Sequence, residues 1–153
     1  MLSQKTKLIG VAKLKTYPDW SIKSHSHLFH EFIVILKGKT QVEIADQIID
    51  AGQGDVLCYP EGIVHQEYID EQDPIETIYI GWEGNLHNWM FKIHDVNGRM
   101  RLLAEWLYSQ EHDDSENNYQ IQNAYLTAIL AEHMRLCGQS GEDNLVRNIR
   151  TFM

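Results

Sequence analysis

The sequence predicts one mainly β domain, a small antiparallel sandwich or barrel, followed by two or three C-terminal helices. Up to residue 97, apolar residues come in short runs separated by turns that contain Gly or Pro, a pattern typical of such a barrel. From Arg99 onwards they recur at helical spacing instead. A chain of 153 residues can form one domain with its own core, but not two ordinary ones.

The expected strands follow one another closely along the chain. Residues 1–22 are expected to form an arm and a first strand, and residues 23–97 the barrel. A long strand over residues 25–38, with the sequence HSHLFHEFIVILKG, organises the barrel, because polar groups on one of its faces run straight into an apolar stretch of the same face. The remaining strands are expected over residues 41–44, from 48 onwards, and over 56–59, 65–69 and 75–82.

The long strand also carries the clearest functional signal. Alternate side chains of a strand share one face. His25, His27 and Glu31 are therefore expected to point the same way as Ile33 and Ile35. Polar groups at the mouth of a cavity with apolar residues at its base are typical of a binding pocket. The even-numbered residues are also mostly apolar, which predicts a strand covered on both faces.

Residues 25–38 and 54–65 together resemble the two sequence motifs of the cupin superfamily. Their spacings are H-x-H-x3-E-x6-G and G-x5-P-x-G-x2-H. The resemblance implies a cupin-like antiparallel barrel, a double-stranded β-helix of jelly-roll type. It also implies one site made of four residues, His25, His27, Glu31 and His65. The chain departs from the motifs at Asp19, in place of a Gly, and at Ile69, in place of an Asn.

These four residues allow three interpretations. They could hold a divalent transition metal such as zinc, iron, nickel or manganese. They could instead hydrogen-bond the hydroxyls of an organic ligand without any required cofactor, which is the interpretation that we favour. Some could also lie at the barrel rim for structural reasons only.

Aromatic residues can complete a sugar site, since a ring packs well against a pyranose. Trp82 is the expected ligand-binding aromatic, with Trp20 and Trp89 as further candidates and core packing as the alternative for each. Trp106 is expected in the core of the helical region. His30 points away from the site by strand parity and is expected to be an ordinary surface or packing residue.

Residues 98–138 are expected to be a helical dimerisation region. The longest helix begins at Tyr119 and runs to Cys137, with apolar residues on two faces. One face would pack on the barrel and the other on a second copy of the chain, giving a homodimer. Gly138 is expected to end this helix, and residues 139–153 are expected to be a linker and the start of a truncated DNA-binding domain.

A cupin barrel followed by helices and the closing LVRNIRTFM resembles the N-terminal half of AraC-type transcription regulators, over residues 20–153. The resemblance implies that the barrel binds a small effector, often a sugar, that the helices dimerise, and that the arm can close over the ligand. It assigns DNA binding to a C-terminal part absent here, and no catalysis. The alternatives are a metal-dependent cupin enzyme, such as a dioxygenase or an isomerase, and a stand-alone dimerisation module with a vestigial pocket.

Composition excludes several other classes. With 13 basic and 22 acidic residues, the formal charge of -9 argues against nucleic-acid binding by this chain itself. The two cysteines, Cys58 and Cys137, form no disulfide framework. There is neither a signal peptide nor an apolar run long enough to span a membrane. We therefore expect a cytoplasmic protein.

Overall fold

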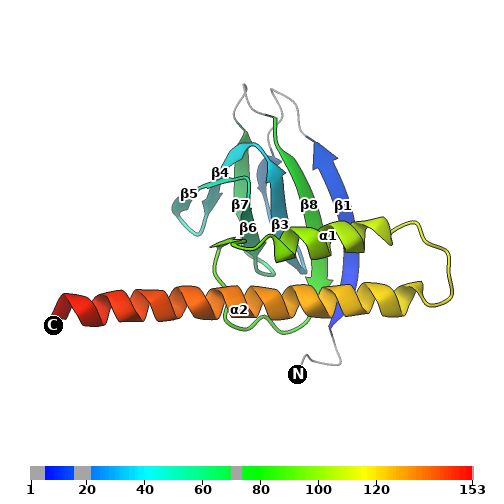
Figure 1. Ribbon diagram of the computed structural model, residues 1–153. Helices are drawn as coiled ribbons and strands as arrows, with labels where there is room; N and C mark the ends of the chain where they lie inside the picture. The colour runs from blue at the N-terminus through cyan, green and yellow to red at the C-terminus, as the bar shows by residue number, and fades with distance from the viewer. Residues whose placement is uncertain (1–5, 16–21, 70–73, 153) are drawn as a thin grey trace.

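The short alternating segments pair into two antiparallel sheets, and two helices follow them (Figure 1). The computed structural model describes residues 6–15, 22–69 and 74–152, without the side chains of 22–24, 69 and 139–152. The five-stranded sheet has the order β1 (Lys7–Lys15), β8 (Glu76–Glu83), β3 (His30–Lys37), β6 (Asp55–Tyr59) and β9 (Lys92–His94). The four-stranded sheet has the order β2 (Ile22–His25), β7 (His65–Ile69), β4 (Lys39–Ile44) and β5 (Gln47–Gly52). The predicted mainly β fold, an antiparallel sandwich followed by helices, is confirmed.

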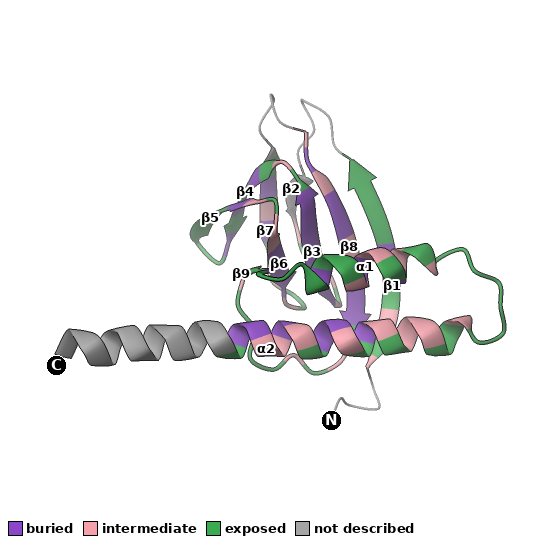
Figure 2. Cartoon of the chain, in the orientation of Figure 1, coloured by how far each residue is buried: buried purple, intermediate pink, exposed green. Residues whose placement is uncertain are grey.

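Strand β3 lies between two separate cores, as its two apolar faces predict. Phe32 and Val34 belong to a core between the five-stranded sheet and the helices. Ile33 and Ile35 belong to a second core between the two sheets. Figure 2 shows the buried strands of this sheet and the buried stripe of the long helix that faces them.

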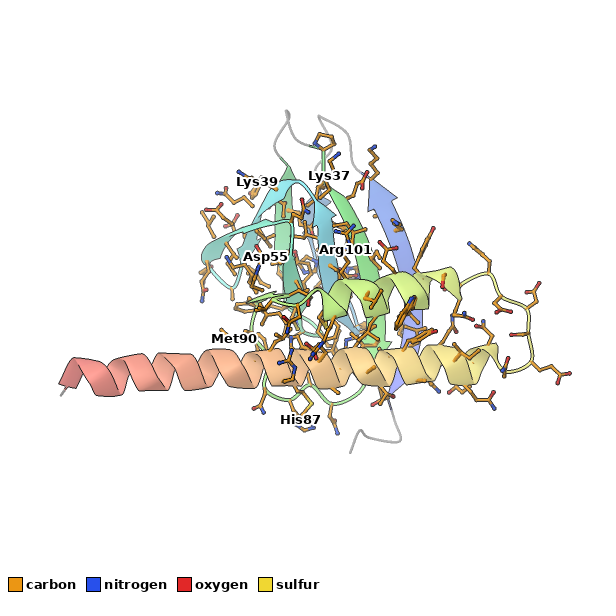
Figure 3. All side chains as sticks on the ribbon, viewed as in Figure 1. Lys37, Lys39, Asp55, His87, Met90 and Arg101 are labelled. Atoms are coloured by element: carbon orange, nitrogen blue, oxygen red, sulfur yellow. The ribbon has the colours of Figure 1, made fainter. Side chains whose placement is uncertain are left out.

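Tight turns fix how the strands follow one another. Ala45 and Asp46 both have positive φ between β4 and β5, the geometry that favours a two-residue hairpin. Gly38, between Lys37 and Lys39 (Figure 3), has φ 90°, and a Cβ there would lie 2.6 Å from the carbonyl oxygen of Pro74. Only glycine fits this position without strain.

Asp55 (Figure 3) ties the start of β6 to its neighbours. Its carboxylate accepts a hydrogen bond from the backbone N–H of Gly52 at 2.9 Å and lies 3.1 Å from Nδ1 of His94 on β9. The Gly-Asp corner of the second motif therefore has a structural role here.

The predicted long strand over residues 25–38 is wrong as a single element. Strand β2 ends at His25 and β3 begins at His30, so residues 26–29 form a connection. The two strands belong to different sheets, and the chain must cross from one sheet to the other between them. The first strand expected within residues 1–22 is present, whereas the arm stays a prediction. Strand β1 pairs with β8, while residues 1–5 and 16–21 lie outside the described residues.

The helices begin where the sequence predicts. Helix α1 (Arg99–Ser109) starts after Asp95, whose carboxylate accepts the backbone N–H groups of Met100 at 3.1 Å and Arg101 at 3.0 Å. Two first-turn N–H groups without helical partners are satisfied in this way. Trp106, expected in the core, is 46% exposed on α1, so that expectation is wrong.

Helix α2 (Asn118–Phe152) is longer than predicted. The predicted end at Gly138 is wrong, because the helix continues through that residue. That residues 139–153 act as a linker and the start of a further domain stays a prediction. A glycine inside a helix costs only about 1 kcal/mol relative to alanine, and no proline follows to force an end. The domain boundaries themselves stay predictions. None of the described helices combines the length and the apolar character needed to cross a membrane.

Candidate functional site

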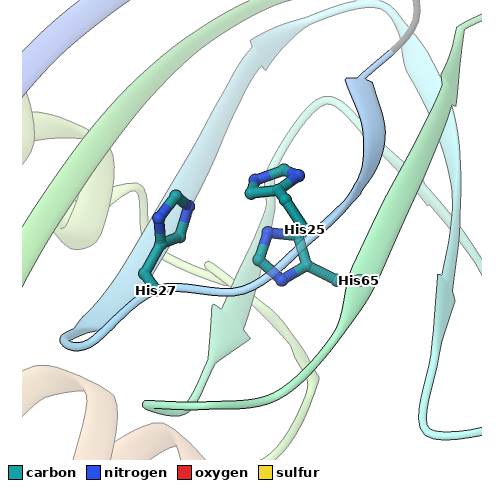
Figure 4. Close-up of side chains that lie close together, drawn as sticks. All are labelled: His25, His27 and His65. Atoms are coloured by element: carbon teal, nitrogen blue, oxygen red, sulfur yellow. The ribbon is translucent and has the colours of Figure 1, made fainter.

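Three histidines from separate parts of the chain converge at one end of the space between the sheets (Figure 4). His25 is the last residue of β2 and pairs in register with His65, the first residue of β7. His27 reaches the same place from the connection between β2 and β3. One ring nitrogen of each can be chosen so that all three lie within 4.8 Å of one another.

The ring of His65 is held on two sides. It stacks on Tyr59, with ring centroids 3.8 Å apart, and its Nδ1 lies 3.2 Å from the carbonyl oxygen of Ile63. A proton on Nδ1 donates to this carbonyl and leaves the lone pair on Nε2. That Nε2 is buried and has no hydrogen-bond partner among the described residues.

The surroundings favour the neutral form of two of these imidazoles, those of His65 and His27. Burial, followed by the nearby His25, lowers the pKa of His65 to about 4. The same two causes, in the same order, lower the pKa of His27. A neutral imidazole whose other nitrogen is oriented by a carbonyl is the form that binds a metal. The donor set of His25, His27 and His65 therefore fits a divalent transition metal.

Glu31, the fourth predicted residue, lies beside this cluster. Its Oε2 is 3.7 Å from Nε2 of His27, and it is not one of the three residues whose ligand atoms converge. Burial and then the nearby Glu67 raise the pKa of Glu31 to about 7. The sequence motif therefore locates all four residues correctly in one region, but the structure gathers only three of them closely.

Sequence reasoning left open whether Glu67 points inward, and the structure places it in a polar centre next to Glu31. Glu67 on β7 is buried, and the hydroxyls of Tyr59 and Tyr79 donate hydrogen bonds to its two carboxylate oxygens at 2.9 and 3.4 Å. Burial raises the pKa of Glu67, although the two phenols partly oppose this. Strand parity could have placed Glu67 at the site, because Glu67 lies two residues after His65 and therefore lies on the same face of β7.

Trp82 lies on the other face of β8 from the barrel interior. It is 1% exposed in the core beneath the helices, with its ring 5.6 Å from that of Phe32. Alternation along β8 turns Tyr79 toward the space between the sheets and Trp82 away from it. The structure therefore supports core packing, the alternative given for Trp82, over packing against a ligand between the sheets. Trp20 lies outside the described residues.

His30 is a packing residue, as predicted, and it also supports the site. Its Nε2 lies 2.8 Å from the carbonyl oxygen of Gly84, and its Nδ1 accepts the backbone N–H of Glu61 at 2.9 Å. The backbone N–H of Gly62 donates to the carbonyl of His27 at 2.8 Å. The loop before His65 is thereby attached to β3 and to the connection that carries His27.

A groove of about 240 Å³ adjoins the histidine cluster, near the lower end of the roughly 300–1,000 Å³ usual for ligand pockets. We call it the β1 groove, and its lining includes Gly10, Ala12, Phe29, Glu31, Tyr79 and Glu111. Phe29 forms a shared wall, because its ring also stacks on His27 at 4.8 Å between centroids. A further hollow of about 260 Å³ lies on the other side of His65, against β4 and the loop before β7.

One family of known proteins matches most of this chain. A family profile described as "AraC-like ligand binding domain" matches residues 11–147. No curated protein matches the chain.

Among solved structures, a cupin protein from Bacteroides fragilis is 24% identical, with a TM-score of 0.45 over 52% of this chain and 70% of its own. A cupin superfamily protein from Desulfitobacterium hafniense is 18% identical, with a TM-score of 0.45 over 54% and 72%. The oxalate decarboxylase of Bacillus subtilis, described with Mn(II) centres, is 22% identical, with a TM-score of 0.42 over 50% of this chain. The match spans only 22% of the decarboxylase chain.

Proposed function

Because the chain belongs to the family of AraC-like ligand-binding domains, we propose that it senses a small polar effector between its two sheets and catalyses no reaction. One observation carries this proposal: polar side chains converge above an apolar core in the space between the sheets. They are His25, His27, His65, Glu31, Glu67, Tyr59 and Tyr79.

The chemistry of these groups supports a polyhydroxylated ligand such as a sugar. Each sugar hydroxyl both donates and accepts, and the imidazoles and phenols can do the same, while carboxylates accept. Of these seven side chains, His25, His27, Glu31 and His65 were predicted from the sequence. The aromatic packing partner that we now propose is Phe29 or Tyr79, since both line the β1 groove.

We further propose that the effector acts on a homodimer. Binding would shift the N-terminal arm, or the helix pair, between two arrangements, which requires different affinities for the two states. Such a shift would change DNA binding by the DNA-binding domain of the same regulator, not by this acidic domain itself. A cytoplasmic location also stays a prediction.

A thermal-shift screen with monosaccharides and disaccharides at millimolar concentrations tests effector binding. A ligand that binds only the folded state raises the melting temperature. We expect at least one sugar to do so with the unaltered chain, and the shift to disappear in His27→Ala. His112→Ala is the matched control, because His112 lies exposed in the loop between the helices. A panel without any shift, or equal shifts in His27→Ala and the unaltered chain, would contradict the proposal.

A metal-dependent cupin enzyme is the second candidate, favoured by the convergence of three imidazoles. His25, His27 and His65 would hold a zinc, iron, nickel or manganese ion, with Glu31 beside it. A bound ion would supply a Lewis acid with open positions for a dioxygenase or isomerase reaction. Elemental mass spectrometry on untagged protein, never exposed to a nickel column, distinguishes the candidates. About one ion per chain, lost in His65→Ala, would favour a metal protein over a metal-free sensor.

A further inference from the structure

The β1 groove is created by a missing side chain at the edge of the five-stranded sheet. Gly10, Gly81 and Glu31 lie side by side in register on β1, β8 and β3. A Cβ on Gly81 would lie 2.9 Å from the Phe29 ring, so that ring already fills the space above Gly81. A Cβ on Gly10 would meet nothing within 4 Å. The space beside Gly10 is therefore open, and Glu31 borders it.

Glu31 is a mostly buried residue that lines this groove. It is 8% exposed, and no side-chain hydrogen bond to it is found among the described residues. Its Oε2 lies 3.7 Å from Nε2 of His27, beyond hydrogen-bond distance, and the nearby Glu67 interacts with it electrostatically. A carboxylate is rarely buried to this extent without a partner. A polar ligand group in the groove would supply that partner.

The charges around the groove select the kind of group. Glu31 and Glu111 line it, and none of the described lining residues is Lys, Arg or His. The rings of Phe29 and Tyr79 line it as well. Carboxylates attract a cation and accept its hydrogen bonds, and the faces of aromatic rings attract a cation as well. Carboxylates and aromatic faces both repel an anion such as a carboxylate or a phosphate.

We propose that the β1 groove binds an ammonium group of the effector. The inference rests on the proposed sensor function and narrows it from any small polar molecule to one that carries an amine. The histidine cluster, which shares the Phe29 wall, would contact the polar remainder of the same molecule.

Three probes that share a pyranose ring and differ mainly in charge test this inference: glucosamine, glucose and glucuronate. Isothermal titration calorimetry is performed on the full chain after treatment with a chelator. We expect the dissociation constant of glucosamine to be at least about tenfold below that of glucose, as a charge-assisted hydrogen bond would give, and glucuronate to bind most weakly. Equal binding of glucose and glucosamine overturns the inference while leaving the sensor function intact. Tighter binding of glucuronate, or no binding of glucosamine, also overturns it.

Two variants locate the effect in the groove. Glu31→Gln keeps the shape and removes the charge, so glucosamine should bind it no better than glucose. Gly10→Val fills the open space without a clash at Cβ and should abolish the preference for glucosamine with little change in melting temperature. Glu83→Gln is the control, because Glu83 lies exposed on β8 outside the groove lining. An unchanged preference in both groove variants would assign the binding to another part of the barrel.

Discussion

Glu67 is a carboxyl group buried between two sheets, and its environment explains why it is tolerated there. An ionised or polar group inside a protein is destabilising unless it is hydrogen-bonded. The hydroxyl of Tyr59 donates to one carboxylate oxygen, and that of Tyr79 donates to the other. The two phenols therefore fix the side chain of Glu67 at the centre of the candidate site.

Tyr59→Phe tests how much the shorter of these hydrogen bonds contributes. The substitution keeps the ring that stacks on His65 and leaves one oxygen of Glu67 without its donor. We expect the free energy of unfolding to fall by about 1–3 kcal/mol, measured by urea denaturation. Tyr68→Phe is the matched control, since Tyr68 donates to Glu43 at 3.1 Å on the exposed surface and should change stability by less than about 0.5 kcal/mol. Equal losses in both variants would show that burial does not strengthen the interaction.

At the scale of single residues, the sequence predicted the site better than its surroundings. The motif spacing located His25, His27 and His65 in one place, although not through the strand parity first invoked. Glu67 could have been found by parity from His65. Trp82 could not have been placed correctly, because which face of β8 lies toward the other sheet depends on its register with β3.

At the scale of elements, the contact between α2 and the five-stranded sheet contains a buried histidine. His133 on α2 is 1% exposed, and its ring lies 4.6 Å from that of Phe32 on β3. Its Nε2 lies 3.6 Å from Sγ of Cys137, one turn further along the helix. Burial lowers the pKa of His133 from 6.5 to about 4.

The packing of α2 should therefore be sensitive to acid. Between about pH 6.5 and pH 4 the unfolded chain binds a proton at His133 and the folded chain does not, so stability falls as the pH is lowered. The full effect of this group is up to roughly 3 kcal/mol. We expect His133→Leu to lose correspondingly less stability than the unaltered chain over this range, measured by urea denaturation at each pH. His112→Leu, in the exposed loop, should behave like the unaltered chain. Parallel pH profiles for all three proteins would contradict the assignment to His133.

Element types were predictable, but two of their limits were not. Residues 25–38 were predicted as one strand because both the odd-numbered and the even-numbered side chains are mostly apolar. No turn residue in this stretch indicates where the chain crosses from one sheet to the other. Helix α2 passes Gly138 because a single unfavourable residue does not end a helix. Both boundaries depend on tertiary packing rather than on local sequence.

At the scale of the whole molecule, one apolar stripe of α2 packs within the protomer, which leaves other faces of the helices for the predicted second copy. Leu126, Ile129 and Leu130 of α2 are buried in the protomer's own core. Among the described side chains of α1, the exposed large apolar ones are Leu102, 48% exposed, and Trp106, 46% exposed. Tyr125 of α2 lies against Trp106, with ring centroids 5.9 Å apart. We call Leu102, Trp106 and Tyr125 the helix-layer patch.

If the predicted homodimer forms through the helices, we expect it to cover the helix-layer patch. Apolar side chains exposed side by side are typical of protein interfaces, and a tryptophan is a frequent source of binding energy there.

We expect the unaltered chain to sediment as a dimer at micromolar concentration, and the double variant Leu102→Glu with Trp106→Glu to sediment as a folded monomer. A substitution at Leu130 on α2, such as Leu130→Asp, cannot test the dimer interface. Leu130 is 4% exposed, and a buried aspartate there would unfold the protomer. Ile48→Glu is the matched control, since Ile48 is an apolar residue 68% exposed on β5 of the other sheet. A monomeric unaltered chain would refute the dimer. A dimer that persists in the double variant but dissociates in Ile48→Glu would move the interface from the helices to the four-stranded sheet.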